Sequence, residues 1–167
     1  MEALTMSIQE RADILRQLDW PKGISELDAL KLARFLVVFQ TPKGHTVFRQ
    51  GDEASYLGIV IQGKLCVQKD DPTPMPHEIA LLEKGDVFGE MSIVDGQPRS
   101  ATIHAVEDSL MLLLPSESFA TLLAEFPRIN AKILMSLARS MSERLRRTND
   151  WLIEVLQYVA QKQDAKA

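Results

Sequence analysis

The sequence predicts a mainly β protein with flanking helices: an antiparallel, jelly-roll-like β-roll of two sheets, preceded by helices and followed by one long helix. Three observations predict this class. Short apolar runs separated by Gly, Pro and Asp fill residues 35–114, helical spacing precedes them, and no glycine or proline follows Pro127. Short strands at this spacing are typical of a sandwich or barrel. We divide the chain into a helical segment (1–34), a β-roll (35–126) and a C-terminal helix (127–167).

Two short helices are expected before the sheet. Residues 7–10 fit a capping box, and apolar residues follow at helical spacing until Trp20-Pro21, which predicts a helix over about 8–18. A second helix is expected to begin at Ser25, where a serine precedes another periodic run. Its expected core residues are Leu27, Leu30 and Ala33.

The β-rich region contains seven strand candidates: Phe35–Phe39, Thr46–Phe48, Leu57–Gln62, Lys64–Lys69, His77–Glu83, Ala101–Val106 and Ser109–Leu114. The segment 70–76 is expected to be an exposed loop, because its three prolines cannot join a ladder. Ser116 is expected to cap a helix that stops near Phe126, because Pro127 disfavours helical geometry in the residue before it.

Residues 128 to about 162 can form one helix, which is long enough to need a partner for its apolar stripe. The stripe advances in alternating steps of four and three, the spacing of a two-helix seam. Its members are Leu134, Ala138, Met141, Leu145, Thr148, Leu152, Val155 and Val159. We therefore expect a parallel homodimer; the alternative is that the stripe packs on the chain's own sheet, as part of its N-terminal half is expected to do.

Composition excludes several classes of protein. With 46% hydrophobic and 25% charged residues, the chain has the composition of a globular protein, and its net charge of −4 disfavours a general nucleic-acid-binding surface. No apolar run is long enough for a bilayer and the N-terminus has no signal-peptide pattern, so we expect a cytoplasmic protein without membrane contact. The single cysteine, Cys66, lies in an apolar run and is expected to be a buried structural thiol.

The stretch from Phe88 to Thr102 has the parts that suit a phosphorylated ligand. Gly89 permits unusual dihedrals and close approach, and residues 90–94 are expected to form a helical turn whose free N–H groups favour an anion. The rigid fork of Arg99 matches a phosphate. Glu90 can only accept hydrogen bonds when ionised, which suits a sugar hydroxyl. A phosphate and a ribose together indicate a nucleotide.

The pattern Phe88-Gly89-Glu90-Met91-Ser92, six residues, then Arg99-Ser100-Ala101-Thr102 resembles the phosphate-binding cassette of the cyclic nucleotide-binding domain family. Residues 42–44, 48–52, 61–65 and 84–89 are similar to other turns of that family, in the same order. The resemblance implies a regulatory domain that binds a cyclic nucleotide and is not an enzyme. It implies that the ligand contacts Gly89, Glu90, Met91, Arg99, Ser100 and Ala101, with Val67, Ile79 and Ala80 beside the base.

The segment 141–149 is similar to the dimerisation helix of bacterial regulators in the same family. By position, Thr148 would contact an adenine, Asn149 would reach the base in the other subunit, and Arg144 would close on Glu90. Such regulators continue into a helix-turn-helix domain, and no DNA-binding domain is expected in this chain. The resemblance thus implies that ligand binding repositions the helix, and that a second subunit or an unknown downstream protein detects the change.

The resemblance favours cAMP over cGMP as the ligand. The family commonly places a threonine after the cassette arginine to bind guanine, whereas Ser100 supplies a shorter hydroxyl, as in bacterial cAMP binders. Amide side chains can offer either a donor or an acceptor, so Asn149 leaves cGMP open. No cofactor is expected besides the nucleotide ligand.

Sequence features also bear on two other kinds of function, an enzyme and an interaction module. His45, His77 and His104 lack the spacing of metal ligands and no Walker-type loop is present, so neither a metal site nor an enzyme is expected. The stronger rival is an interaction module that keeps the cassette as structure and binds no nucleotide. The trio Glu90, Arg99 and Ser100 speaks against it, because a purely structural role does not require all three.

Overall fold

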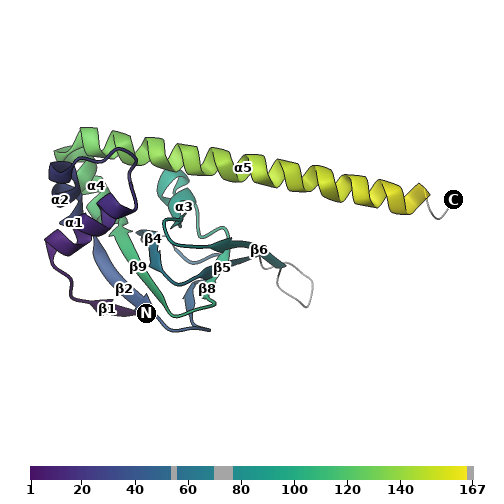
Figure 1. Ribbon diagram of the computed structural model, residues 1–167, viewed down its shortest axis with the longest axis horizontal. Helices are drawn as coiled ribbons and strands as arrows, with labels where there is room; N and C mark the ends of the chain where they lie inside the picture. Colours follow the sequence, from purple (N-terminus) through teal and green to yellow (C-terminus); the bar gives the residue numbers. More distant parts are fainter. Residues whose placement is uncertain (54–55, 70–76, 165–167) are drawn as a thin grey trace.

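The computed structural model describes residues 1–53, 56–69 and 77–164 of the chain, so the predicted loop over 70–76 lies outside the described residues. Two β-sheets form the body of the fold, several helices gather at one end of it, and one long helix runs along the top of the view and extends past the sheets (Figure 1). The helices are α1 (Ile8–Gln17), α2 (Glu26–Ala33), α3 (Glu90–Asp95), α4 (Ser116–Glu125) and α5 (Pro127–Asp164). The strands are β1 (Glu2–Leu4), β2 (Val37–Thr41), β3 (Thr46–Phe48), β4 (Tyr56–Gln62), β5 (Leu65–Lys69), β6 (His77–Leu82), β7 (Val87–Phe88), β8 (Thr102–Ala105) and β9 (Ser109–Pro115).

The strands form a five-stranded sheet in the order β1-β2-β9-β4-β7 and a four-stranded sheet in the order β3-β8-β5-β6. All pairings between these strands are antiparallel, which confirms the predicted double-sheet β-roll.

The central strands of the five-stranded sheet, β4 and β9, are buried on both faces. On β4, Val60 points into the core between the sheets while its neighbour Ile59 packs in the core beneath the helices. On β9, Met111 points into the core between the sheets and Leu112 packs in the core beneath the helices, because successive side chains of a strand point to opposite faces. The core beneath the helices also includes residues from α1 and α5, so it joins all three segments into which we divided the sequence. The division of the chain into these three segments stays a prediction.

The two N-terminal helices begin where their caps predict. The Ser7 hydroxyl accepts from the Glu10 amide at 3.2 Å, and the Glu10 carboxylate accepts from the Ser7 amide at 2.8 Å, which confirms the capping box. Ser25 caps α2 through the Asp28 amide. The placement of Leu27 in the core was wrong: Leu27 is 63% exposed, because the inward face of α2 is formed by Ala29, Leu32 and Ala33.

Two more elements differ from the prediction. Strand β1 was not predicted, because all three of its residues are exposed and show no alternation of apolar and polar side chains. Ser116 is not a cap: strand β9 continues to Pro115, which is itself the residue before the helix and makes no side-chain capping bond. The break between α4 and α5 does fall at Phe126, directly before Pro127, as expected.

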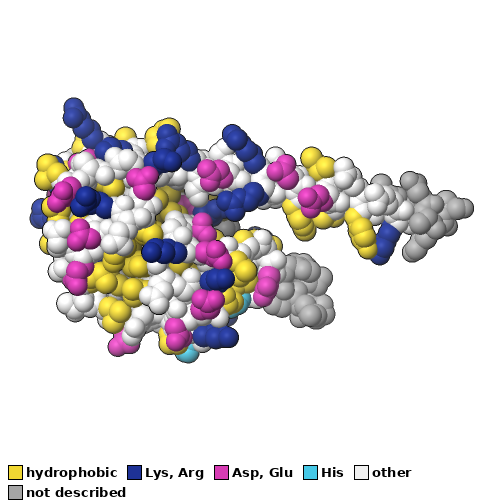
Figure 2. Space-filling model, viewed as in Figure 1, with side chains coloured by type: hydrophobic (Ala, Val, Ile, Leu, Met, Phe, Trp, Pro, Cys, Tyr) yellow, Lys and Arg dark blue, Asp and Glu magenta, His cyan; other side chains and the backbone are white. Residues whose placement is uncertain are grey.

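Helix α5 has two neighbouring apolar faces. Ile129, Ile133 and Leu137 are buried in the core beneath the helices. The predicted seam lies on the other face, where Leu145 is 61% and Leu152 49% exposed. Every side chain from residue 145 to residue 154 is exposed, and Figure 2 shows this part of α5 extending past the β-roll. No described helix combines the length and apolar composition needed to cross a membrane.

Candidate functional site

The backbone of the cassette, residues 88–102, brings two segments into close approach. Gly89 follows β7 in the left-handed conformation (φ 71°) and precedes α3, which confirms the expected helical turn. A Cβ on Gly89 would lie 2.4 Å from Nη1 of Arg99 and 3.1 Å from the Tyr56 carbonyl oxygen. Glycine is therefore required here both by the dihedral angle and by the space that the arginine occupies.

Arg99 is buried beneath the cassette, with 2% of its surface exposed. Its Nη1 donates to the Gly89 carbonyl at 3.0 Å and its Nη2 to the Tyr56 carbonyl at 2.7 Å. The guanidinium carbon lies 4.1 Å from the centre of the Phe48 ring and 4.7 Å from that of Tyr56, within the range of cation–π contacts. The buried Nε has no hydrogen-bond partner among the described residues.

Burial lowers the pKa of Arg99, and the negative charges of Glu90 and Asp52 oppose that effect. The guanidinium stays cationic nonetheless, because arginine does not lose its proton in proteins. Burial likewise raises the pKa of the Tyr56 phenol, which keeps that ring neutral beside the cation. The aromatic walls of Phe48 and Tyr56 were not predicted as site residues; Phe48 belonged to a recognised turn, but nothing in the sequence pairs Tyr56 with Arg99.

Glu90 connects the cassette to α5. Its carboxylate is buried, with 3% of the side chain exposed, and it accepts from Nη1 of Arg144 at 2.7 Å. Arg144 also donates to the Val87 carbonyl and, at 3.3 Å, to the Ser140 hydroxyl. The structure thus contains the contact between Arg144 and Glu90 that the sequence led us to expect.

The other cassette residues lie near the surface. The Ser100 hydroxyl donates to the sulfur of Met91 at 3.5 Å, and Met91 is 44% exposed. Lys69, which was not predicted as a site residue, donates from Nζ to the Ser100 carbonyl at 2.6 Å. Ala101 is buried directly before β8. The cassette therefore has a buried arginine and carboxylate below an accessible rim.

The residues expected beside the base are less closely gathered. Val67 and Ala80 are partners across β5 and β6, with Val67 half-buried and Ala80 exposed, and Ile79 is 59% exposed. On α5, Thr148 and Asn149 are exposed. The Thr148 hydroxyl donates to the Arg144 carbonyl at 2.9 Å, a bond within its own helix.

The β-roll thus holds a buried arginine and a buried carboxylate, and an ion pair ties that carboxylate to the long helix. The profile of the cyclic nucleotide-binding domain matches residues 38–126, more than half of the chain. The chain belongs to the cyclic nucleotide-binding domain family.

Several relatives support this assignment. The cyclic AMP receptor protein of Thermus thermophilus is 35% identical over 102 residues, which cover 61% of this chain and 47% of that protein. A CRP-like cAMP-activated global transcriptional regulator of Mycobacterium tuberculosis is 28% identical over 144 residues, 86% of this chain and 62% of that protein. The chain thus spans about half to three fifths of the length of these relatives.

Solved structures show the same fold. A cyclic nucleotide-binding domain from Methylobacillus flagellatus superposes with a TM-score of 0.83 at 26% identity, covering 91% of this chain and 87% of that one. The catabolite activator protein of Thermus thermophilus superposes with a TM-score of 0.69 at 29% identity, covering 84% of this chain and 62% of that one.

Proposed function

We propose that this chain is a cytoplasmic, non-enzymatic cAMP sensor, in which nucleotide binding at the cassette changes the position of α5. The observation that carries this proposal is the ion pair between Glu90 and Arg144, because it joins the expected ribose-binding carboxylate directly to the helix. The proposed ligand-binding residues are Gly89, Glu90, Met91, Arg99, Ser100, Ala101, Val67, Ile79, Ala80, Arg144, Thr148 and Asn149.

Arg99 is proposed to bind the cyclic phosphate. A guanidinium carries five N–H donors, and the contacts to Gly89 and Tyr56 occupy one on each terminal nitrogen. The buried Nε is left without a partner among the described residues, which is costly unless a ligand supplies one. A phosphate that accepts from Nε and from the second N–H of a terminal nitrogen would satisfy this donor in a bidentate pair.

Glu90 is proposed to bind the ribose. Arg144 contacts the Oε1 atom of Glu90, and a carboxylate has a second oxygen that can accept from a ribose hydroxyl. Ligand and helix would then share one carboxylate. The position of Arg144 would therefore affect nucleotide affinity, and nucleotide would affect the position of Arg144, since coupling between two sites is reciprocal.

Thr148 supports cAMP over cGMP. Its hydroxyl proton is donated to the Arg144 carbonyl, so the oxygen can only accept from a ligand. Adenine carries an amino donor at the position where guanine carries a carbonyl acceptor. A threonine held in this state complements adenine when α5 closes over the base, with Val67, Ile79 and Ala80 on the opposite side.

We also propose that two copies pair along α5. The seam residues Leu145 and Leu152 are well exposed, and no described part of the chain covers them. Exposed leucines at seam spacing lose contact with water when two helices associate. Asn149 of each subunit would then face the base bound in the other, and a downstream protein would detect the arrangement of the helix pair.

Calorimetric titration with cAMP and cGMP tests the site. We expect cAMP to bind more tightly, and Arg99→Ala to weaken binding by about 2 to 5 kcal/mol, the cost of truncating one partner of a buried charge pair. Arg99→Lys keeps the charge without the fork and should also weaken binding. Arg139→Ala, an exposed arginine on α5, is the control. If Arg99→Lys binds like Arg139→Ala while remaining folded by circular dichroism, the site assignment is wrong.

Two results of the same titration would change the proposal itself. A clear preference for cGMP would overturn the assignment of the base. Failure of the parent protein to bind either nucleotide would favour the interaction module, in which the cassette serves only as structure.

Hydrogen exchange over residues 140–160, with and without saturating cAMP, tests the role of the helix. A coupling of about 1 to 3 kcal/mol is typical of allosteric proteins and would give measurably slower exchange. Residues 88–102 are the internal control for binding. Clear protection there with none in α5 would remove the helix from the mechanism.

Sedimentation tests the pairing of two chains. The double variant Leu145→Glu/Leu152→Glu places charge on the seam and should sediment as a monomer, whereas the parent sediments as a dimer. Ile153→Glu adds the same charge at a site that is 54% exposed and off the seam, so it should remain dimeric. A parent protein that sediments as a monomer contradicts the proposed dimer.

A further inference from the structure

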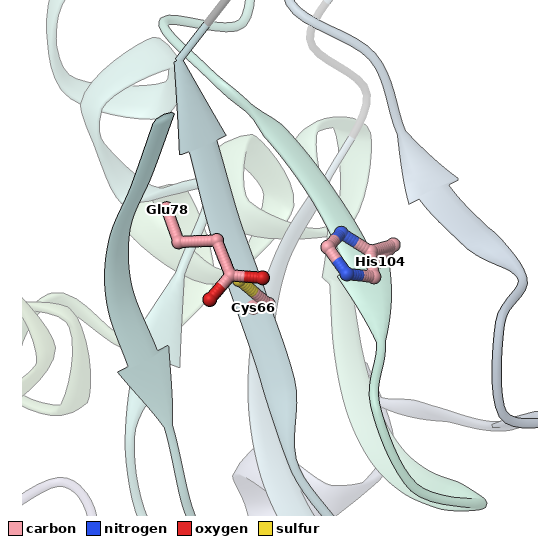
Figure 3. Close-up of side chains that lie close together, drawn as sticks. All are labelled: Cys66, Glu78 and His104. Carbon is pink, nitrogen blue, oxygen red and sulfur yellow. The ribbon is translucent and has the colours of Figure 1, made fainter. Parts of the chain in front are cut away.

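Three strands of the four-stranded sheet bring a thiol, a carboxylate and an imidazole together. The residues are Cys66 on β5, Glu78 on β6 and His104 on β8, and their potential ligand atoms all lie within 4.8 Å of one another. Figure 3 shows the Glu78 carboxylate in front of the Cys66 sulfur, with the His104 ring on the neighbouring strand. The spacing in the sequence does not predict this cluster, because only strand pairing unites the three residues.

The register of the sheet explains the arrangement. Cys66 lies opposite His104 in the pairing of β5 with β8. In the pairing of β5 with β6, the register shifts after Val67, and Glu78 lies opposite Gln68, which shares a face of β5 with Cys66. Paired residues project from the same face of a sheet, so all three side chains converge.

This face points away from the nucleotide site. Leu65 and Ala105, which flank the cluster along β5 and β8, are fully buried in the core between the sheets. Cys66 and His104 alternate with them and so lie on the outer face. Of the residues proposed to lie beside the base, Val67 and Ala80 form a pair on the opposite face. The cluster is therefore separate from the cassette.

The cluster is closed on one side and open on the other. Cys66 is fully buried, His104 is half-buried and Glu78 is exposed. The exposed Glu78 carboxylate faces the buried Cys66 sulfur. A cation between them would contact both groups, and solvent could reach it from the open side.

We propose that Cys66, Glu78 and His104 bind one Zn²⁺ ion on the outer face of the four-stranded sheet. Thiolate, imidazole and carboxylate are the ligand types of protein-bound zinc, and the thiolate disfavours magnesium and calcium. Zinc bonds of about 2.0 to 2.3 Å place tetrahedral ligand atoms roughly 3.3 to 3.8 Å apart. Atoms already within 4.8 Å of one another can reach that spacing by small side-chain rotations.

Coordination would have a structural effect. Zinc binds the thiolate, so binding releases the Cys66 proton to solvent, and water completes the fourth position. Among the described strands, β6 is at the edge of its sheet and pairs with β5 alone. A zinc ion would attach this edge strand, through Glu78, to β5 and also to β8.

Titration of the metal-free full chain with Co²⁺ tests the site, because cobalt in a zinc site reports its ligands in the absorption spectrum. We expect one Co²⁺ per chain, a thiolate-to-cobalt charge-transfer band, and loss of that band when Zn²⁺ displaces cobalt. Cys66→Ser should abolish the band. His104→Gln and Glu78→Gln should each weaken Co²⁺ binding by at least the roughly 10- to 100-fold that loss of an outer-shell partner costs.

Glu83→Gln is the matched control, since it makes the same chemical change just after β6, where Glu83 pairs with Lys64 at 3.0 Å. Its titration should match that of the parent. Absence of the band in the parent, persistence of the band in Cys66→Ser, or equal affinities of Glu78→Gln and Glu83→Gln would each overturn the proposed site.

Thermal unfolding gives a second readout that does not depend on Cys66→Ser folding. Zn²⁺ at a hundred times its dissociation constant should raise the Tm of the parent by about 5 to 11 °C. The shift should vanish in His104→Gln, whose side chain is only half-buried and is not part of the core. An equal shift in parent and His104→Gln would place the ion elsewhere.

Discussion

The ion pair between Arg144 and Glu90 allows a quantitative prediction for the variant Arg144→Ala. The substitution removes the cation that forms an ion pair with the Glu90 carboxylate, whose side chain is only 3% exposed. Breaking a fully buried pair costs about 3 to 5 kcal/mol, whereas exposed pairs are worth about 0 to 1 kcal/mol. The side chain of Arg144 is 37% exposed, so solvent screens part of the interaction. We expect a loss of about 1 to 3 kcal/mol, which lowers the Tm by roughly 2 to 12 °C at this chain length.

Thermal unfolding followed by circular dichroism measures this loss. The matched control is Arg147→Ala, which removes an exposed arginine three residues further along the same helix. Adding Glu90→Gln to Arg144→Ala removes the stranded charge, so the double variant should be more stable than the sum of the two single losses predicts. If Arg144→Ala unfolds at the same temperature as Arg147→Ala, the pair does not hold α5 to the cassette.

Three further predictions concern single positions. Gly89→Ala should weaken cAMP binding in calorimetry and cost about 1 to 2 kcal/mol of stability, because alanine is strained at φ 71° and its Cβ would lie 2.4 Å from the cassette guanidinium. Gly58→Ala should cost about 1 to 3 kcal/mol in urea unfolding, since its Cβ would lie 2.1 Å from the ring of Phe88; a smaller residue at Phe88 should restore part of this loss, and no loss at all would contradict the packing. Burial works to raise the pKa of Asp28, but hydrogen bonds and charge from Lys132 outweigh it and hold the pKa below the ordinary 3.8. Asp28 therefore stabilises the fold above about pH 4 and loses this contribution as the pH falls, so the Tm difference between the parent and Asp28→Asn should shrink in acid, and a difference independent of pH would refute the role of this charge.

The sequence predicted correctly those helix starts whose capping contacts join residues only a few positions apart. Ser7 and Ser25 cap helices through amides three residues away, so the sequence shows both partners of each bond. The orientation of α2 was wrong at Leu27, because eight residues give too few turns to fix which face meets the core. Strand β1 was missed because its pairing with β2, and not any buried side chain, holds it in place.

The site residues follow the same rule: those that lie close in sequence were predicted, and those that only strand pairing brings together were not. The glycine, glutamate and arginine of the cassette lie close in sequence and could be recognised together. The rings that enclose Arg99 come from β3 and β4, and the partners of Cys66 come from β6 and β8. Such contacts depend on strand register over tens of residues, which the hydrophobic pattern of each strand does not specify.

Helix α5 is continuous over 38 residues; its first turns are anchored in the core, and its described side chains from residue 145 to residue 154 are exposed. Twenty residues lie beyond Arg144, which at 1.5 Å per residue give an arm of about 30 Å. A tilt of about 10° about that point displaces the tip by roughly 5 Å, the length of one helical turn. If nucleotide binding shifts Glu90 as proposed, leverage of this kind would turn a small adjustment there into a movement large enough to realign the side chains that a neighbouring molecule would touch.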